Sequence, residues 1–381
     1  MSIADQLTEN KVPLIFSLIH LAHVSGVKWS LLRSFVRRDS DFYGCYEIRK
    51  RSGGNRRICV PEPALKLIQK WIHANILRST GALARLHSAS TAYAPGASIK
   101  KNADSHVGAA WLIKLDIKDF FESISERQVY WVFRDLGYPA LLSFELARLT
   151  TRVAPPRRDG TMRHRDKMWR WSNNASQAYP AYKPGRVTGN LPQGAPTSAM
   201  LSNLAVRELD VQIQLIAARH HATYTRYADD ITLTLVQGSR PACAEIFRSV
   251  ADAITHAGFR VNKCKSRISG PGSRKIITGL VITSKAARVA KNVRSEIEIA
   301  LHYIKKHGLL DHIERCGHKN PVGYLNYLYG RIYFVRSIEF DFGTRALEEL
   351  NALIKTYEGL GWSSKPFKIV RSDLVFHSAK K

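Results

Sequence analysis

The chain has 381 residues and a mass of 42.9 kDa, and 45% of its residues are hydrophobic, which provides a core and excludes general disorder. Lys and Arg number 58 against 31 Asp and Glu, giving a formal net charge of +27. Such a charge repels itself unless an acidic partner neutralises it, and nucleic acid is the most direct candidate. No stretch reaches the roughly 20 apolar residues of a membrane-spanning helix, so we expect no membrane partner.

The N-terminus and the cysteines predict the compartment. The first ten residues, MSIADQLTEN, are polar and acidic and do not resemble a secretory signal. Five scattered cysteines form no CxxC spacing, which argues against structural zinc and against a disulfide framework. We therefore expect a cytoplasmic protein with reduced thiols.

The first 77 residues predict helices on both sides of a basic hairpin. Apolar residues recur with helical period over 13–37, which predicts two short helices. Two β-type runs flank the turn Ser52-Gly53-Gly54-Asn55 and predict a hairpin. The stretch from Ala64 to Leu77 predicts a helix that Pro63 can open.

A strand, a helix and a basic loop follow. Trp111 to Asp116 reads as a short apolar strand that ends in a carboxylate, and Ser125 with Gln128 fits a capping box for the next helix. Residues 152–190 lose periodicity and carry nine Lys or Arg against two Asp. A loop of this length inside a compact domain is usually functional or disordered.

Later segments alternate between helices and short strands before a basic, helical end. We expect helices at 196–219 and 241–257, a hairpin at 222–236 with Ala228, Asp229 and Asp230 at its tip, strands within 259–283 and mostly helix over 290–381. The change of pattern near 285 predicts a domain boundary.

The acids Asp229 and Asp230 stand inside a β-rich apolar run, where charges are disfavoured unless a cation neutralises them. Alone, the pair also fits an ordinary acidic hairpin turn. Asp116 likewise ends an apolar strand, and it would meet the hairpin tip if the two strands lie side by side. Three converging carboxylates would bind two Mg²⁺ ions, an arrangement that stabilises the attacking and leaving oxygens of a phosphoryl transfer.

The segment LPQGAPTS, residues 191–198, lies between these acids along the chain. It predicts a tight turn with small side chains that leads into a helix. A nucleobase pair could rest on this turn. A plain loop leading into a helix is the alternative.

The order of LDIKDFF, LPQGAPTSAMLSNLAV, YADD, NKCK and ITGLVI over about residues 45–283 resembles the reverse transcriptases, which copy RNA into DNA. The resemblance implies an α+β right-hand polymerase fold. Its expected parts are an N-terminal helical segment at 1–40, fingers at 41–110, a palm with an antiparallel sheet and the basic insertion at 111–284, and a helical, RNA-binding thumb at 285–381.

The same resemblance implies site residues. Asp116, Asp229 and Asp230 match the catalytic aspartates that hold the metal ions. Phe121 stands where the family has an aromatic side chain that blocks a ribose 2′-hydroxyl, although it could be a core residue beside Phe120. The implied nucleotide-binding residues are Arg56, Arg57, Phe121, Gln193, Gly194 and Lys265. Which of Arg56 and Arg57 holds the triphosphate stays open, as does which of Lys263 and Lys265 protonates the leaving pyrophosphate.

A narrower resemblance, to the retron reverse transcriptases, rests on two motifs. Asn102-Ala103-Asp104-Ser105-His106 fits their Asn-Ala-x-x-His pattern, and Ile277-Thr278-Gly279 nearly fits their Val-Thr-Gly pattern. The implied RNA-binding residues are Asn102, His106, Thr278, Gly279, Lys291 and Arg294. A surface position or a place at the edge of the core is the alternative for His106.

The retron resemblance also implies partners. A structured non-coding RNA would serve as template and primer, with dNTPs as substrates and a branched RNA–DNA started from a 2′-hydroxyl as product. Family behaviour implies anti-phage defence with an effector protein in trans, in a higher-order assembly. We further hypothesise that the 152–190 loop contacts RNA phosphates or a partner protein.

Two other interpretations remain. One is a different reverse transcriptase, either a group II intron protein or another defence-associated type. The other is a catalytically silent RNA-binding scaffold, against which the presence of all three aspartates argues.

Overall fold

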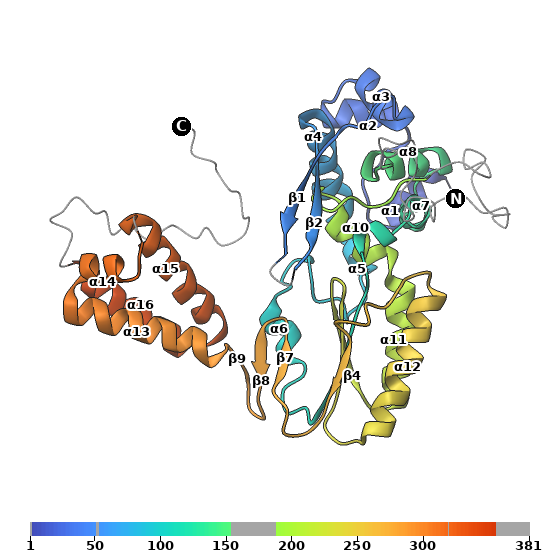
Figure 1. Ribbon diagram of the computed structural model, residues 1–381. Coiled ribbons are helices and arrows are strands. Elements are labelled where there is room, and N and C mark those ends of the chain that lie inside the picture. Colours follow the sequence, from blue (N-terminus) through green and yellow to red (C-terminus); the bar gives the residue numbers. More distant parts are fainter. Residues whose placement is uncertain (1, 51–52, 154–187, 319, 356–381) are drawn as a thin grey trace. The chain divides into compact units, whose positions relative to one another are not determined.

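The computed structural model describes residues 2–50, 53–153, 188–318 and 320–355 (Figure 1). The chain forms two compact units, Met1–Thr278 and Gly279–Lys381. The division falls at the turn between two short strands, whereas the sequence predicted a boundary near 285.

The N-terminal segment contains three short helices, α1 (Ile3–Glu9), α2 (Leu18–Ser25) and α3 (Trp29–Arg37). The last two confirm the pair of helices predicted within 13–37. The sequence analysis missed α1, although Ser2 and Asp5 form a capping box at its start.

A hairpin of β1 (Tyr43–Arg49) and β2 (Asn55–Pro61) follows, as predicted, with antiparallel pairing. Helix α4 (Pro63–Trp71) begins at the predicted proline and continues as the π-helical turn η1 (Ile72–Leu77). Two short helices, α5 (Thr80–Ala84) and α6 (Ile99–Asp104), lead to the central sheet.

The central sheet is antiparallel and has the strand order β4-β5-β3-β6. Its strands are β3 (Trp111–Asp116), β4 (Thr223–Tyr227), β5 (Asp230–Leu235) and β6 (Arg267–Ser269). Ile113, Leu115, Ile231 and Leu233 are buried in its core. An antiparallel sheet packed with helices confirms the expected α+β class.

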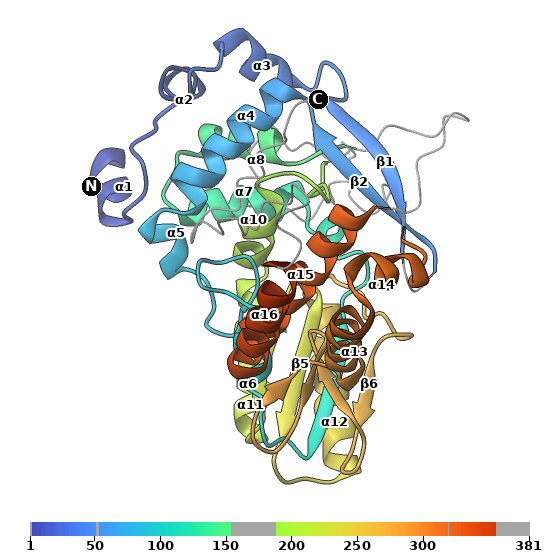
Figure 2. The same cartoon turned by 90° about the vertical axis from the view of Figure 1, so that its left-hand side faces the viewer.

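Further helices of the first unit follow β3 along the chain. After the short 3-10 turn η2 (Phe121–Ser123), they are α7 (Glu126–Asp135), α8 (Ala140–Thr150), α10 (Ser198–Ala205), α11 (Arg207–Arg219) and α12 (Arg240–His256). The predicted helix at 196–219 is thus two helices that meet at Val206. Figures 1 and 2 show α11 and α12 side by side against the sheet, where α11 packs on β4 and α12 on β3 and β6.

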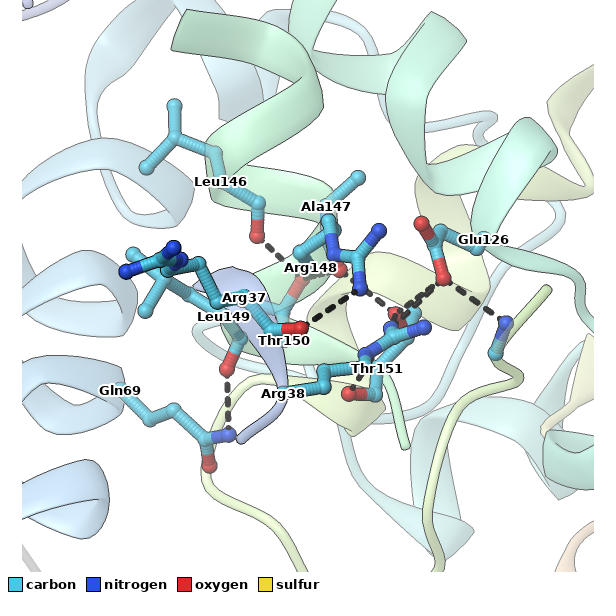
Figure 3. Close-up of polar contacts among 11 residues, drawn as sticks. Arg37, Arg38, Gln69, Glu126, Leu146, Ala147, Arg148, Leu149, Thr150 and Thr151 are labelled. Carbon is cyan, nitrogen blue, oxygen red and sulfur yellow. Dashed lines mark hydrogen bonds and ion pairs between the residues drawn. The ribbon is translucent and has the colours of Figure 1, made fainter. Parts of the chain in front are cut away.

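The two ends of the predicted basic insertion are joined. Arg152 N donates to Asn190 O at 2.9 Å and Asn190 N donates to Arg152 O at 3.0 Å. Glu126, beside this bridge, pairs with Arg38 and accepts from the backbone N–H of Gly189 (Figure 3). Residues 154–187, and with them most of the predicted loop, lie outside the described part.

The second unit begins with the paired strands β8 (Leu280–Ile282) and β9 (Ala287–Arg288), while the preceding strand β7 (Lys275–Ile277) belongs to the first unit. Its described residues continue with the helices α13 (Lys291–His307), α14 (Leu309–Arg315), α15 (Pro321–Ile338) and α16 (Phe340–Lys355). They confirm the helical prediction up to residue 355. In the parts of the chain that are described, no helix has both the length and the apolar character needed to span a membrane.

Candidate active site

The three aspartates meet at one end of the central sheet. Asp116 ends β3 and stands directly opposite Asp230, the first residue of β5. Ala228 and Asp229 form the turn that joins β4 to β5, and the carbonyl of Asp229 accepts a hydrogen bond from Ile117 N at 3.0 Å. The strands therefore lie side by side, which was the condition for the carboxylates to converge.

Two lysines neutralise two of the three acids. Lys265 Nζ lies 3.0 Å from Asp116 Oδ2, and Lys114 Nζ lies 2.6 Å from Asp230 Oδ2. Among the described residues, Asp229 makes no ion pair within 4 Å. The carboxylate of Asp229 is thus the one with the greatest need for an added cation.

The pKa shifts agree with this arrangement. Burial, reinforced by repulsion from Asp116, raises the pKa of Asp229 above its ordinary value. Burial also raises the pKa of Asp230, although Lys114 opposes the shift. Burial acts to lower the pKa of Lys265, but its bond to Asp116 outweighs this and raises it, so the ammonium group stays charged at neutral pH.

A pocket of about 820 Å³ opens between this edge of the sheet and the β1–β2 hairpin. Asp116 and Asp229 form part of its lining. The lining also includes five of the predicted nucleotide-binding residues, which are Arg56, Arg57, Phe121, Gln193 and Lys265. Cationic side chains and carboxylates therefore line the same space.

Close packing holds the Gln193-Gly194 turn against β2. The carbonyl of Gln193 accepts from Cys59 N at 2.7 Å. Gly194 has a φ of +114°, and a Cβ at this position would lie 2.8 Å from Ile58 Cγ2 and 3.0 Å from Cys59 O. Only glycine allows this approach, which brings the turn next to the strand that carries Arg56 and Arg57.

The structure distinguishes some of the alternatives left by the sequence. Phe120 is buried in the core, whereas Phe121 is partly exposed and lines the pocket. Lys265 lines the pocket, and Lys263 is exposed outside its lining. Both Arg56 and Arg57 line it, and Arg57 lies 3.6 Å from Glu122.

The sequence analysis missed Tyr93. Its backbone has a φ of +66°, and its ring lies 6.2 Å from that of Phe121 and 6.5 Å from that of Tyr227. Burial, reinforced by Asp229, raises the pKa of Tyr93 to about 12. Its neighbours in the sequence, Ala92 and Ala94, offered no pattern that marked it as a site residue.

Carboxylate oxygens are the ligands that Mg²⁺ prefers, so the chemistry of Asp116 and Asp229 fits a divalent ion. Across the described ranges, however, no three His, Cys, Asp or Glu side chains are gathered closely enough to hold a metal ion as they stand. Instead, the carboxylate of Asp116 accepts a hydrogen bond from Lys265, and the carboxylate of Asp230 accepts one from Lys114.

Two residues predicted to bind RNA are buried. Asn102 and His106 are each only 1% exposed. The ring nitrogens of His106 lie 2.7 Å from the hydroxyl oxygens of Thr234 and Thr225, and the side-chain oxygen of Asn102 accepts from Thr91. Both side chains are therefore held inside the first unit, with their polar groups within hydrogen-bond distance of threonine hydroxyls.

The other predicted RNA-binding residues are more accessible. Thr278 and Gly279 both have positive φ and form the turn after β7, and Thr278 Oγ1 donates to Ile99 O at the start of α6. Thr278 is thereby bonded to α6, the helix that also carries Asn102. In the second unit Lys291 is exposed, whereas Arg294 lies 3.4 Å from Glu339 and stacks on Phe342.

Comparisons with known proteins agree with this geometry. Residues 48–325 match the family "Reverse transcriptase (RNA-dependent DNA polymerase)". The chain is 33% identical over 303 residues to the retron Mx162 reverse transcriptase of Myxococcus xanthus, covering 75% of this chain and 58% of that protein. It is 27% identical over 350 residues to the retron Ec86 reverse transcriptase of Escherichia coli, covering 91% and 92% respectively.

A solved telomerase from Candida albicans, in complex with a fragment of telomeric RNA, is similar at a TM-score of 0.42 and 10% identity, covering 86% of this chain and 65% of that one. The family match spans well over half of the chain, and both curated relatives named above are retron enzymes. The chain belongs to the reverse transcriptase family and is similar to retron members of it.

Proposed function

We propose that this protein is the RNA-directed DNA polymerase of a retron and that Asp116, Asp229 and Asp230 form its catalytic centre. The observation that carries the proposal is the meeting of Asp116 with the Ala228-Asp229 turn at the edge of a pocket lined by arginine, lysine and glutamine side chains. Family membership supports the polymerase activity, and similarity to the retron enzymes supports the narrower assignment.

Each group in the pocket has a proposed task. The reaction joins a primer hydroxyl to the α-phosphorus of a dNTP and breaks the bond to pyrophosphate. Arg56 and Arg57 would bind the triphosphate, and Lys265 would donate a proton to the leaving pyrophosphate. Phe121, next to Tyr93 in the lining, would exclude a ribose 2′-hydroxyl.

Divalent metal chemistry is part of the proposal. Two Mg²⁺ ions, held by Asp116, Asp229 and Asp230, would supply positive charge to the attacking and leaving oxygens. Asp230 would first have to leave Lys114, and Asp116 would have to share its oxygens with Lys265. The lysines keep the carboxylates in place until then.

The nucleic acid partners follow from the retron similarity. We propose a structured non-coding RNA as template and primer, synthesis started from a 2′-hydroxyl, and a branched RNA–DNA product. Anti-phage defence, a trans-acting effector in a larger assembly, and a cytoplasmic location belong to the same proposal. The net charge of +27 and the exposed side chain of Lys291 in the second unit support an RNA-binding surface there.

The proposed role of the 152–190 insertion is to bind RNA phosphates or a partner protein. Its ends are closed by the Arg152–Asn190 backbone bonds, so replacing 154–187 with a short linker should preserve the fold. We expect the shortened protein to extend a simple primer–template while losing assembly with its RNA or its partner. Unchanged assembly would contradict this role.

The test of the proposed function combines activity with product analysis. The double variant Asp229→Asn, Asp230→Asn should lose magnesium-dependent dNTP incorporation and keep its affinity for RNA. Nucleic acid that copurifies with the wild-type protein should contain DNA joined to RNA through a 2′–5′ branch, detectable by sensitivity to a debranching enzyme.

Three outcomes would contradict parts of the proposal. Full activity of the double variant would reject the catalytic centre. Active enzyme with unbranched DNA would reject the retron assignment and favour another kind of reverse transcriptase. Wild-type protein that binds RNA without incorporating dNTPs would favour the scaffold.

A further inference from the structure

A fully buried ion pair lies directly behind the catalytic turn. Arg226 on β4 and Asp210 on α11 are both 0% exposed. Arg226 Nε donates to Asp210 Oδ1 at 2.7 Å, and Arg226 Nη2 donates to Asp210 Oδ2 at 2.6 Å. Removing two charges from water costs several kcal/mol per ion, and stability alone is a weak reason to keep such a pair.

The remaining donor group of this guanidinium reaches the turn itself. Arg226 Nη1 donates to the carbonyl of Ala228 at 3.1 Å and to Asn203 Oδ1 at 3.1 Å. Ala228 has a φ of +58°, a left-handed backbone conformation that is strained for a residue with a Cβ. Such a conformation persists only where surrounding contacts determine it, and the bond from Arg226 is one of those contacts. Ala228 directly precedes Asp229.

The same side chain also contacts Asn203 and Phe120. Asn203 lies on α10, the helix that follows the Gln193-Gly194 turn, and Asn203 Nδ2 donates to Ala92 O at 2.7 Å beside Tyr93. The guanidinium carbon of Arg226 lies 5.9 Å from the ring centroid of Phe120, the neighbour of Phe121. One cation thus touches the turn, the helix behind the nucleotide-binding turn and the aromatic segment.

We propose that Arg226 is a positioning residue that fixes the Ala228-Asp229 turn relative to α10 and thereby sets the place of the Asp229 carboxylate. The inference rests on the proposed catalytic role of Asp229. Arg226 touches neither substrate nor metal in this role and acts through the backbone of Ala228. A planar group with several donors is required, because one side chain must bond Asp210, Asn203 and Ala228 at the same time.

The test variant is Arg226→Lys, which keeps a positive charge beside Asp210 but cannot bond all three partners. We expect kcat for dNTP incorporation to fall by about 10- to 100-fold, the cost typical of a misplaced catalytic group, with KM for dNTP within threefold of wild type. Hydrogen exchange should quicken at the Ile117 amide, which donates to Asp229 O, because the turn is less firmly held.

The matched control is Tyr224→Phe. Tyr224 OH donates to Asp210 Oδ1 at 2.6 Å, so this variant weakens the same buried network and leaves the bonds from Arg226 to Asp210, Asn203 and Ala228 in place. It should lower the melting temperature while kcat and the exchange of Ile117 stay within threefold of wild type. If kcat falls equally in both variants at equal loss of melting temperature, Arg226 is merely structural and the proposal is overturned. Wild-type kcat and Ile117 exchange in Arg226→Lys would also overturn it.

Asn203→Ala covers the case in which Arg226→Lys does not fold. It keeps the ion pair but removes the link to α10, and we expect kcat to fall about 3- to 10-fold at unchanged KM. Wild-type kcat in this variant would overturn the proposal. Asp229→Asn, assayed in parallel, separates the two hypotheses: an active Asp229→Asn rejects the proposed catalytic centre, whereas an inactive Asp229→Asn with an active Arg226→Lys rejects only the positioning role.

Discussion

Two carboxylates of the first unit, those of Glu126 and Asp229, have opposite environments. At the base of the insertion, Glu126 is 1% exposed, lies 2.6 Å from Arg38 and accepts from the backbone N–H of Gly189 at 2.7 Å (Figure 3). At the end of the central sheet, Asp229 lies beside Asp116 and makes no ion pair with another described residue. Glu126 is removed from water and compensated by an ion pair, whereas Asp229 is half-buried in the pocket lining and has no such ion pair among the described residues.

The pKa values of Glu126 and Asp229 shift in opposite directions. Burial would raise the pKa of Glu126, yet Arg38, Arg148 and the Gly189 N–H outweigh it and hold the pKa below its ordinary value. Burial and like charge raise the pKa of Asp229. An acid whose pKa is lowered by folding stabilises the fold at neutral pH, whereas an acid whose pKa is raised destabilises it. Acids with raised pKa values are typical of functional sites.

The largest effect expected from this comparison is on catalysis. Asp229→Asn should lower dNTP incorporation by about 1,000-fold or more, equivalent to roughly 4 kcal/mol of transition-state stabilisation. Its melting temperature should be unchanged or higher, because the substitution removes a repelled charge. Steady-state incorporation and a thermal melt check both parts. A marked loss of stability would show that Asp229 resembles Glu126 after all.

Glu126→Gln should show the reverse pattern. Removing one partner from a buried ion pair typically costs 3–5 kcal/mol, and we expect roughly that loss in the free energy of unfolding, measured by urea denaturation. Below the unfolding transition, kcat should stay within about threefold of wild type. The exposed Glu208 provides a control, since Glu208→Gln should leave the denaturation midpoint unchanged. Loss of kcat in folded Glu126→Gln would break the contrast between the two sites.

Features set by neighbouring residues could be predicted from the sequence. The apolar strand ending at Asp116, the capping box of Ser125 and Gln128, and the hairpin around Asp229 all appear where the local pattern indicated. The convergence of the aspartates was predictable as well, because two strands with acids at their ends need only lie side by side.

Features that depend on distant partners were not predictable. The sequence of β4 alone does not indicate that Arg226 is buried, because its partners Asp210 and Asn203 lie on the helices α11 and α10. The sequence around His106 does not indicate that its two ring nitrogens lie within hydrogen-bond distance of two threonine hydroxyls. Tyr93 has a positive φ, a backbone conformation that is uncommon for tyrosine, so its place in the pocket lining could not be predicted.

His106 extends the comparison to a buried base. Burial, with a smaller effect of Lys114, lowers its pKa from the usual 6.5 to about 4, so the native state favours the neutral ring. The corresponding stability is complete above about pH 6.5 and is lost as pH falls toward 4, by up to about 3 kcal/mol. Denaturation between pH 7 and 4.5 should show a shallower decline in His106→Gln than in wild type. His23→Gln, at an exposed position, should decline as steeply as wild type; equal slopes in all three would contradict the assignment.

The smallest effect concerns the cation at the catalytic edge. Lys265 is 54% exposed, and exposed ion pairs contribute at most about 1 kcal/mol, so Lys265→Met should barely change stability, unlike the loss of a partner of Glu126. Because its ammonium group is proposed to protonate pyrophosphate, kcat should fall about 10- to 100-fold, less than in Asp229→Asn.

Lys263→Met tests the neighbouring lysine, which lies outside the pocket lining, and should keep near-normal kcat. If Lys263→Met is the slower enzyme, the proton comes from Lys263, and the bond between Lys265 and Asp116 serves only to hold the carboxylate.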